Sequence, residues 1–231
     1  MTDQQRKALL SLYEDLRVCD ARDGMDALGY FHYGTVDAAI RPLWRTRAVG
    51  IARTVRYLPY VGPTPNLSPR EYRDEWSSMY YSEICKYPWE KEIEAGDFVV
   101  IDQSSMKVGL MGSENTLARM NQGARGFITN GGVRDTDEII LQKVPFWSAG
   151  IAQSMVQVRL QFDAMNIPVA IGGVTIRPGD MVVADGDGVI SVPQEIAEDV
   201  ARFAHEEHDA DKERRRGHYQ AAGMQLDETV S

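Results

Sequence analysis

Residues 112–135 read GSENTLARMNQGARGFITNGGVRD, and this stretch decides the fold class of the chain. Ser113 to Gln122 gathers its apolar residues on one helical face, and Gly123 follows at the position where a glycine commonly ends a helix. The apolar run from Gly126 to Asn130 has the length of a strand. A helix followed directly by a buried strand predicts an α/β fold.

Apolar runs of strand length flank this stretch on both sides. The phrase Gly96-Asp97-Phe98-Val99-Val100-Ile101-Asp102 is echoed by Gly179-Asp180-Met181-Val182-Val183-Ala184-Asp185. Ile167 to Ile176 predicts a hairpin, because its central Gly-Gly permits the positive φ of a tight turn. Alternation from Val156 to Phe162 predicts a half-buried strand. With further strands expected at 48–57 and 188–193, strands outnumber helices, which favours a layered mixed sheet over a doubly wound one.

The length fits one domain with segments attached to it. With 231 residues and 43% hydrophobic residues, the chain can bury one large core. Helical spacing predicts an N-terminal helical segment, with helices at Gln4 to Val18 and Asp20 to Gly29. A Pro- and aromatic-rich excursion follows at about 57–92, with a helix expected at Trp76 to Trp89. We therefore expect a single domain over 1–231, closed by a C-terminal helix and tail from about 194.

Composition and charge argue against several classes of function. The net charge of −9 disfavours nucleic-acid binding, because affinity for phosphates comes from clustered Lys and Arg. No run approaches the roughly 18 apolar residues of a membrane span, and the N-terminal residues lack the apolar region of a signal peptide, so we expect a cytoplasmic protein without membrane contact.

Cys19 and Cys85 have no metal-ligand spacing and are expected as reduced thiols. His205 and His208 lie one turn apart on a highly charged helix, where a solvated face is favoured over a metal site.

Gly112 and the pair Arg134-Asp135 form the candidate site. Gly112 precedes a helix whose first N–H groups lack partners inside the helix and suit an anion. Arg134 and Asp135 come where a strand gives way to a helix, the place where open α/β sheets present ligand groups. A carboxylate held by Arg134 and by the N–H groups of Glu114 and Asn115 leaves Asp135 facing a metal ion. The alternative is structural, because Asp135 also fits a capping box with the glutamate three residues on, and Arg134 a surface ion pair.

These phrases resemble the RraA-like family, which includes the class II 4-hydroxy-4-methyl-2-oxoglutarate aldolases. The resemblance extends from Val18-Cys19-Asp20-Ala21, through Gly131-Gly132-Val133-Arg134-Asp135, to Asp185-Gly186-Asp187-Gly188-Val189. It implies a layered β/β/α swivelling fold, a homotrimer or a dimer of trimers (a homohexamer), and a site at a subunit boundary. It also implies that Arg134 and the loop from Gly112 to Asn115 bind a 2-oxo acid, and that Asp135 anchors Mg²⁺ or Mn²⁺.

One position departs from the family pattern. The family's aldolases carry an aspartate directly after the glycine, paired with the arginine to activate a water, and this chain has Ser113 there. The resemblance thus puts Arg134 and Ser113 at the catalytic positions, although a serine hydroxyl does not replace a carboxylate as base near neutral pH. The side chain of Glu114 is expected to point elsewhere on the helix. The aldolases also take an acid from a neighbouring subunit's C-terminal helix, a region that here holds Glu206, Glu207 and Asp209.

The sequence therefore predicts a divalent-metal-dependent carbon–carbon lyase that acts on a small 2-oxo acid and releases pyruvate, by retro-aldol cleavage, oxaloacetate decarboxylation or both. Two alternatives stay open. The first is a non-catalytic regulator that binds another protein, as the family's namesake binds ribonuclease E. The second is a dehydratase or isomerase of a sugar-derived acid, for which the excursion at about 57–92 reshapes the pocket; the same excursion also fits a role in oligomer packing.

Overall fold

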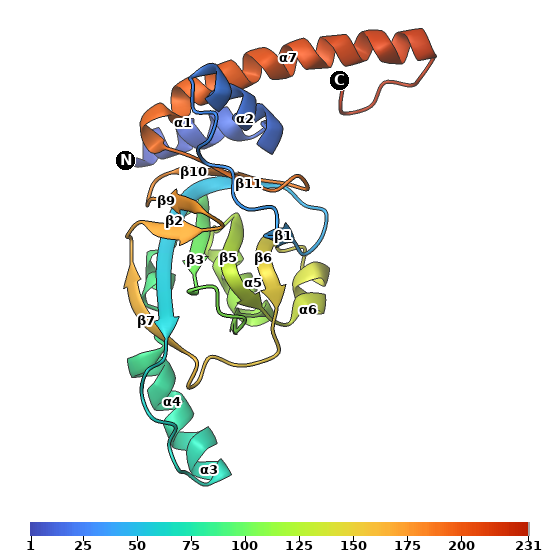
Figure 1. Ribbon diagram of the computed structural model, residues 1–231. Helices are drawn as coiled ribbons and strands as arrows, with labels where there is room; N and C mark the ends of the chain where they lie inside the picture. The colour runs from blue at the N-terminus through green and yellow to red at the C-terminus, as the bar shows by residue number, and fades with distance from the viewer. Residues whose placement is uncertain (231) are drawn as a thin grey trace.

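A mixed sheet of nine strands lies at the centre of the structure, a computed structural model that describes residues 1–230 (Figure 1). Its main path runs in the order β1 (Arg41–Pro42), β6 (Phe146–Ile151), β5 (Gly126–Val133), β3 (Asp97–Asp102), β2 (Ala48–Pro59), β10 (Met181–Ala184) and β11 (Val189–Val192). Off this path, β4 (Gly109–Met111) pairs with β5 and β7 (Leu160–Met165) pairs with β2. A separate hairpin is formed by β8 (Val169–Ile171) and β9 (Val174–Ile176).

Parallel and antiparallel pairs occupy different parts of the sheet. The middle strands β2, β3, β5 and β6 pair in parallel, whereas β10, β11, β7 and β1 join them in antiparallel fashion. Every residue of β3 is buried, which is typical of a parallel strand covered on both faces. The prediction of a layered α/β fold with a mixed sheet is therefore confirmed.

The predicted Gly-Gly hairpin is present, but one predicted strand starts late. Gly172 and Gly173 have φ of 51° and 81°, as the tight turn between β8 and β9 requires. The strand expected from Val156 begins only at Leu160. Residues 156–159 form a turn instead, in which the N–H groups of Arg159 and Leu160 donate to the Val156 carbonyl at 2.9 and 3.0 Å. This turn leaves the Val156 side chain buried.

Three helices pack together beside β10 and β11 (Figure 1): α1 (Asp3–Tyr13), α2 (Val18–Ala27) and α7 (Ala197–Ala222), which follows the short 3-10 helix η4 (Gln194–Ile196). The Asp20 carboxylate accepts from the Arg17 N–H at 2.8 Å, so α2 begins two residues before the predicted start. His205 Nε2 lies 2.8 Å from the Leu12 carbonyl, and His208 Nδ1 lies 3.0 Å from the Asp20 carboxylate. The predicted solvated face is thus wrong for these two histidines, which contact α1 and α2.

Within residues 1–230, no helix has both the length and the apolar character to cross a membrane.

A helical arm leaves the body after β2 and returns to the core (Figure 1). It consists of α3 (Pro69–Glu71), the π-helical segment η1 (Tyr72–Trp76), α4 (Ser77–Met79), the π-helical segment η2 (Tyr80–Ile84) and the 3-10 helix η3 (Pro88–Glu92). The helical part starts earlier than predicted, because the Ser68 hydroxyl accepts from the Glu71 N–H and caps it.

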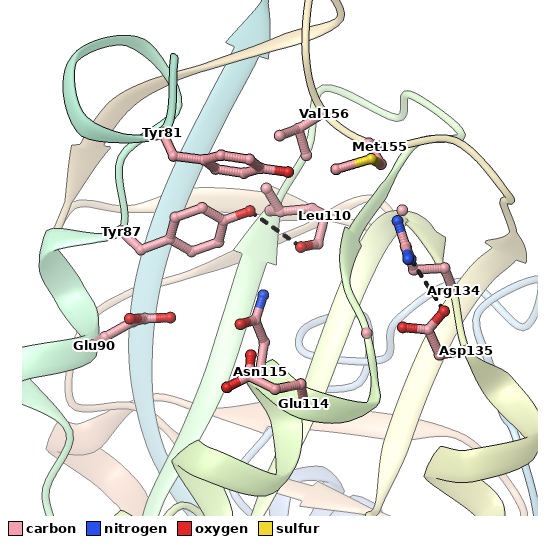
Figure 2. A pocket seen from close by; sticks show the side chains of 12 residues that line it. Tyr81, Tyr87, Glu90, Leu110, Glu114, Asn115, Arg134, Asp135, Met155 and Val156 are labelled. Atoms are coloured by element: carbon pink, nitrogen blue, oxygen red, sulfur yellow. Dashed lines mark hydrogen bonds and ion pairs between the residues drawn. The ribbon is translucent and has the colours of Figure 1, made fainter. Parts of the chain in front are cut away.

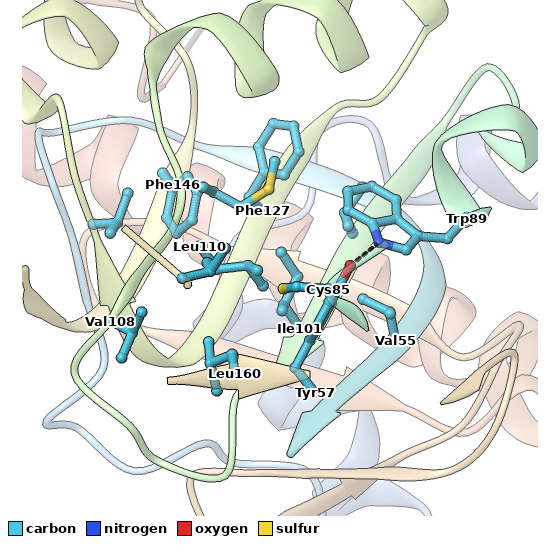
Figure 3. Close-up of a cluster of buried hydrophobic side chains, with 14 of the residues drawn as sticks. Val55, Tyr57, Cys85, Trp89, Ile101, Val108, Leu110, Phe127, Phe146 and Leu160 are labelled. Atoms are coloured by element: carbon cyan, nitrogen blue, oxygen red, sulfur yellow. Dashed lines mark hydrogen bonds between the residues drawn. The ribbon is translucent and has the colours of Figure 1, made fainter. Parts of the chain in front are cut away.

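Buried side chains anchor the returning end of this arm to the sheet. Trp89 Nε1 donates to the Tyr57 hydroxyl at 2.9 Å (Figure 3), and that hydroxyl donates to the Lys86 carbonyl at 2.9 Å. Tyr80 and Cys85 are also fully buried in this cluster. The residues between Tyr81 and Glu90 are therefore held against the sheet, close to the ends of β4 and β5.

Candidate active site

The candidate site forms where β4 and β5 end and the helices α5 (Ser113–Gln122) and α6 (Thr136–Leu141) begin. Helix α5 has the predicted bounds, and Gly123 ends it with φ of 110°. The two strands pair in parallel, so their carboxyl ends meet at the same edge of the sheet. This pairing brings Gly112 beside Arg134 and Asp135.

Gly112 is needed here because of close contact, not because of its backbone angles. Its φ of −136° and ψ of −174° are extended values that any residue adopts. A Cβ at this position would lie 2.3 Å from Asp135 Oδ2, well inside van der Waals contact. The Ser113 N–H faces the same carboxylate, with a nitrogen-to-oxygen distance of 3.4 Å.

Asp135 has a left-handed backbone, with φ of 54° and ψ of 41°, which is uncommon for a residue with a side chain. Its side chain makes no capping hydrogen bond to α6, so the capping-box alternative is wrong. The carboxylate instead accepts from Arg134 Nε at 3.1 Å. Both side chains keep about a third of their surface exposed, 34% for Arg134 and 33% for Asp135, so a ligand can reach them.

These residues lie on one side of a pocket of about 380 Å³ (Figure 2). On the opposite side are Tyr81 and Tyr87 from the arm. The complete lining is Tyr81, Tyr87, Glu90, Gly109, Leu110, Gly112, Glu114, Asn115, Arg134, Asp135, Met155 and Val156. A volume of this size is in the range of small-molecule sites.

The predicted site residues are largely brought together. Gly112, Glu114, Asn115, Arg134 and Asp135 all line the pocket, whereas Ser113 contributes only its backbone contact with Asp135. The Glu114 carboxylate lies beside Asn115 at the pocket, on the side away from Arg134 and Asp135 (Figure 2).

Sequence reasoning missed the other half of the lining. Tyr81, Tyr87 and Glu90 come from the Pro- and aromatic-rich excursion, whose composition was the one available signal. Met155 and Val156 carried no signal, because they lie in or next to a turn that resembled the start of a strand.

Charge is unevenly distributed around the pocket. Among the lining residues of the described chain, Arg134 is the one cation, and Glu90, Glu114 and Asp135 are acidic. Glu90 Oε1 is paired with Arg119 Nη1 at 2.5 Å, while no hydrogen bond or ion pair engages the Glu114 side chain within residues 1–230. Burial raises the pKa of both Tyr81 and Tyr87 above that of an ordinary phenol, so both rings are uncharged at neutral pH.

The donors at the pocket are carboxylate oxygens, which suit a hard divalent cation. Residues 1–230 contain no cluster of three or more His, Cys, Asp or Glu side chains arranged to hold a metal. Asp135 offers a single carboxylate whose Oδ2 occupies the space that a Cβ on Gly112 would fill. Mg²⁺ suits such a site, because it keeps several waters and is often bound through one or two carboxylates and the substrate.

Comparison with known proteins places this fold and sequence in one group. A protein of Halalkalibacterium halodurans, provisionally named a 4-hydroxy-4-methyl-2-oxoglutarate aldolase, is 29% identical over 203 residues, which cover 86% of this chain and 81% of that protein. The crystal structure of an uncharacterized protein from Pseudomonas syringae matches with a TM-score of 0.74 and 26% identity, over 97% of this chain and 98% of the other.

A further structure shares the fold at lower identity. It is RraAS2 of Streptomyces coelicolor, described as an unusual member of the RNase ES inhibitor RraA protein family, with a TM-score of 0.70 and 24% identity over 90% of this chain and 96% of that one. The family model for RraA-like proteins, described as Aldolase/RraA, matches residues 17–191. The chain therefore belongs to the RraA-like family.

Proposed function

We propose that this protein is a divalent-metal-dependent carbon–carbon lyase that acts on a small 2-oxo acid and releases pyruvate. One observation carries the proposal: Arg134, Asp135 and the N-terminus of α5 converge on a single pocket. The aldolase name of the relative from Halalkalibacterium halodurans supports the same reaction class.

Arg134 and α5 bind the substrate carboxylate. The guanidinium offers donors in a fork that matches a carboxylate. The N–H groups of Glu114 and Asn115 belong to the first turn of α5, where backbone donors have no helical partner and the helix dipole favours an anion. These groups fix the orientation of the substrate before any bond breaks.

Asp135 is the residue that would hold Mg²⁺ or Mn²⁺. When bound there, the ion would supply positive charge for the oxygen on which negative charge develops as the carbon–carbon bond breaks. Arg134 Nε, 3.1 Å from Asp135 Oδ1, fixes the orientation of the carboxylate, and the Ser113 N–H approaches its other oxygen.

Cleavage requires a base, and we assign that role to Glu114, a carboxylate in the pocket lining, in preference to Ser113, which is not in the lining. In the retro-aldol direction, the base takes the proton of the C4 hydroxyl, the C3–C4 bond breaks, and its electrons form the enolate of pyruvate while C4 leaves as a carbonyl. Protonation at C3 completes pyruvate. Glu114 lines the pocket without an ion-pair partner in the described chain, whereas Glu90 is committed to Arg119. Oxaloacetate decarboxylation follows the same bond cleavage with CO₂ as the leaving group and needs no base at C4.

The proposal includes a homotrimer or a dimer of trimers. The acids Glu206, Glu207 and Asp209 lie on α7, at the opposite end of the molecule from the arm, and none lines the pocket (Figure 1). An acid from α7 therefore reaches a pocket only from another copy of the chain. Light scattering after size exclusion should give three or six times 25.9 kDa, and an active monomer would contradict this part of the proposal.

A pyruvate-release assay tests the reaction. Oxaloacetate and a panel of 4-hydroxy-2-oxo acids are supplied with Mg²⁺ and then with excess chelator, and we expect chelator-sensitive pyruvate. Arg134→Ala should lower kcat/KM by about 100-fold, because hydrogen bonds to a charged group contribute about 1.5 to 3 kcal/mol each. Phe31→Ala, at a residue 62% exposed that does not line the pocket, is the matched control. Full activity of Arg134→Ala would refute the site, and silence on the whole panel would favour the protein-binding alternative.

A further inference from the structure

The side of the pocket facing away from Arg134 has a lining that differs from the anion-binding side. Tyr81, Tyr87, Leu110 and Val156 meet there, from three separate parts of the chain, and Met155 lies between them and Arg134 (Figure 2). Val156 and Leu110 are 1% and 2% exposed, so they form a fixed apolar wall, while Met155 is 44% exposed at the opening. This side offers aromatic and apolar contact surface to whatever extends beyond the anion-binding groups.

Of the two tyrosine hydroxyls, that of Tyr87 is engaged by the protein itself. Tyr87 donates its hydroxyl to the Leu110 carbonyl at 3.2 Å, which leaves its ring as the contact surface. The Tyr81 ring lies 6.4 Å from that of Tyr87, between centroids, at an interplanar angle of 35°. The two rings therefore form a paired aromatic surface.

Charge at the pocket disfavours a second carboxylate on the ligand. Arg134 is the one cation among the lining residues of the described chain, and the proposed function already assigns it to the first carboxylate. The nearby cation Arg119 is paired with Glu90 and is not in the lining. A second carboxylate directed toward Tyr81 and Tyr87 would therefore find no unpaired cation in the described lining, because Glu90 already engages Arg119.

We propose that the substrate of the retro-aldol reaction is a 2-oxo acid with one carboxylate, whose group beyond the cleaved bond is uncharged and aromatic or bulky and apolar. Tyr81 and Met155 contact that group and determine specificity, and the inference rests on the proposed function for the place of the carboxylate at Arg134. The products are then pyruvate and an apolar aldehyde or ketone.

Binding of two uncleavable analogues tests this specificity directly. Neither 2-oxo-4-phenylbutanoate nor 2-oxoglutarate has the 4-hydroxyl that retro-aldol cleavage needs. Calorimetric titration into the full protein with saturating Mg²⁺ should show the phenyl compound binding at least about tenfold more tightly. Equal affinities, or tighter binding of 2-oxoglutarate, would overturn the inference.

Variants at Tyr81 locate the effect. Tyr81→Ala should weaken binding of 2-oxo-4-phenylbutanoate by roughly tenfold and leave pyruvate binding unchanged, because pyruvate has no group that reaches the ring. Tyr81→Phe should restore the affinity, since the ring and not the hydroxyl makes the contact. Met79→Ala, on the same arm but outside the pocket lining, is the matched control. An equal loss for both ligands in Tyr81→Ala would mean that the residue acts only on the structure of the site.

Turnover separates this inference from the proposed lyase activity. Cleavage of 4-hydroxy-2-oxo-4-phenylbutanoate gives pyruvate and benzaldehyde, and cleavage of 4-hydroxy-2-oxoglutarate gives pyruvate and glyoxylate. Faster pyruvate release from the second compound would refute the substrate class while supporting the lyase. The expected order of binding without pyruvate from either compound would refute the lyase while supporting the substrate class.

Discussion

Gly112→Ala is the most specific perturbation that the structure suggests. The new Cβ would lie 2.3 Å from Asp135 Oδ2 and 3.2 Å from its Cγ, so the carboxylate must move by about 1 Å to reach an ordinary contact distance. The backbone of Gly112 is extended and accepts alanine without strain. The new methyl group therefore clashes only with the end of the Asp135 side chain, and we expect the backbone fold to stay the same.

The expected loss is in metal binding and turnover. A misplacement of about 1 Å in a catalytic group costs on the order of 100-fold in rate, and disturbing the orientation of a metal ligand costs about 10- to 100-fold in affinity. Mn²⁺ titration followed by electron paramagnetic resonance measures the affinity, and pyruvate release measures the rate. The midpoint of thermal unfolding without metal should stay within about 2 °C of the wild type.

Two further glycine substitutions make this prediction sharper. At Gly109 a Cβ would lie 2.8 Å from the Arg134 side chain, so Gly109→Ala should raise KM for the 2-oxo acid more than it weakens Mn²⁺ binding. At Gly217 on α7 a Cβ would meet nothing within 4 Å, so Gly217→Ala should change neither quantity. If Gly112→Ala binds Mn²⁺ and turns over within twofold of the wild type, Asp135 is not the metal ligand.

Three other substitutions test the base and the stability of the fold. Glu114→Gln should lower kcat for a 4-hydroxy-2-oxo acid by about 100-fold with little change in KM, yet spare oxaloacetate decarboxylation; equal losses on both substrates would exclude Glu114 as the base. Trp89→Ala should lower the free energy of unfolding in urea by about 3 to 5 kcal/mol, because it removes a fully buried ring and the hydrogen bond to Tyr57, and a loss below about 1 kcal/mol would contradict this packing. Burial raises the pKa of Asp20, but hydrogen bonds from Arg17 outweigh burial and hold that pKa below its usual value. The Arg17–Asp20 pair therefore stabilises the fold above about pH 4, and this contribution is lost as the pH falls through the lowered pKa of Asp20 in the folded state. In acid titrations, the free energy of unfolding of Asp20→Asn should fall less steeply with decreasing pH than that of the wild type.

The sequence predicted the parts of this protein that depend on short-range pattern. Helix α5 could be bounded because its apolar face and Gly123 lie within one segment, and the Gly-Gly hairpin follows from local φ requirements. The start of β7 was missed because the residues from Val156 alternate in polarity like a strand, although they form a turn. Alternation reports which side chains are buried, and a turn against the core buries alternate residues as well.

The two sides of the pocket also differ in how far they could be predicted from local sequence pattern. Arg134 and Asp135 follow a strand, and Gly112 precedes a helix, so the family motif and the rule for strand ends both identify them. Tyr81 reaches the pocket only because the arm returns to the core through Trp89, and Met155 reaches it from the segment between β6 and β7. No local pattern encodes such a contact, so the sequence indicated the excursion at about 57–92 as a segment that reshapes the pocket but did not identify Tyr81 or Met155.

The backbone of Asp135 connects these observations. In an ordinary N-cap the backbone is extended and the side chain turns back to the N–H groups of its own helix. Here the left-handed conformation accompanies a carboxylate that contacts Arg134 Nε and the Ser113 N–H, while α6 begins without a side-chain cap. The chain thus forgoes a capping interaction of about 1 kcal/mol and adopts an uncommon conformation at the same residue. The lost cap and the uncommon backbone conformation both destabilise the start of α6, and both occur at the residue whose carboxylate lies against Gly112. A bound ligand explains this arrangement better than the stability of α6 does.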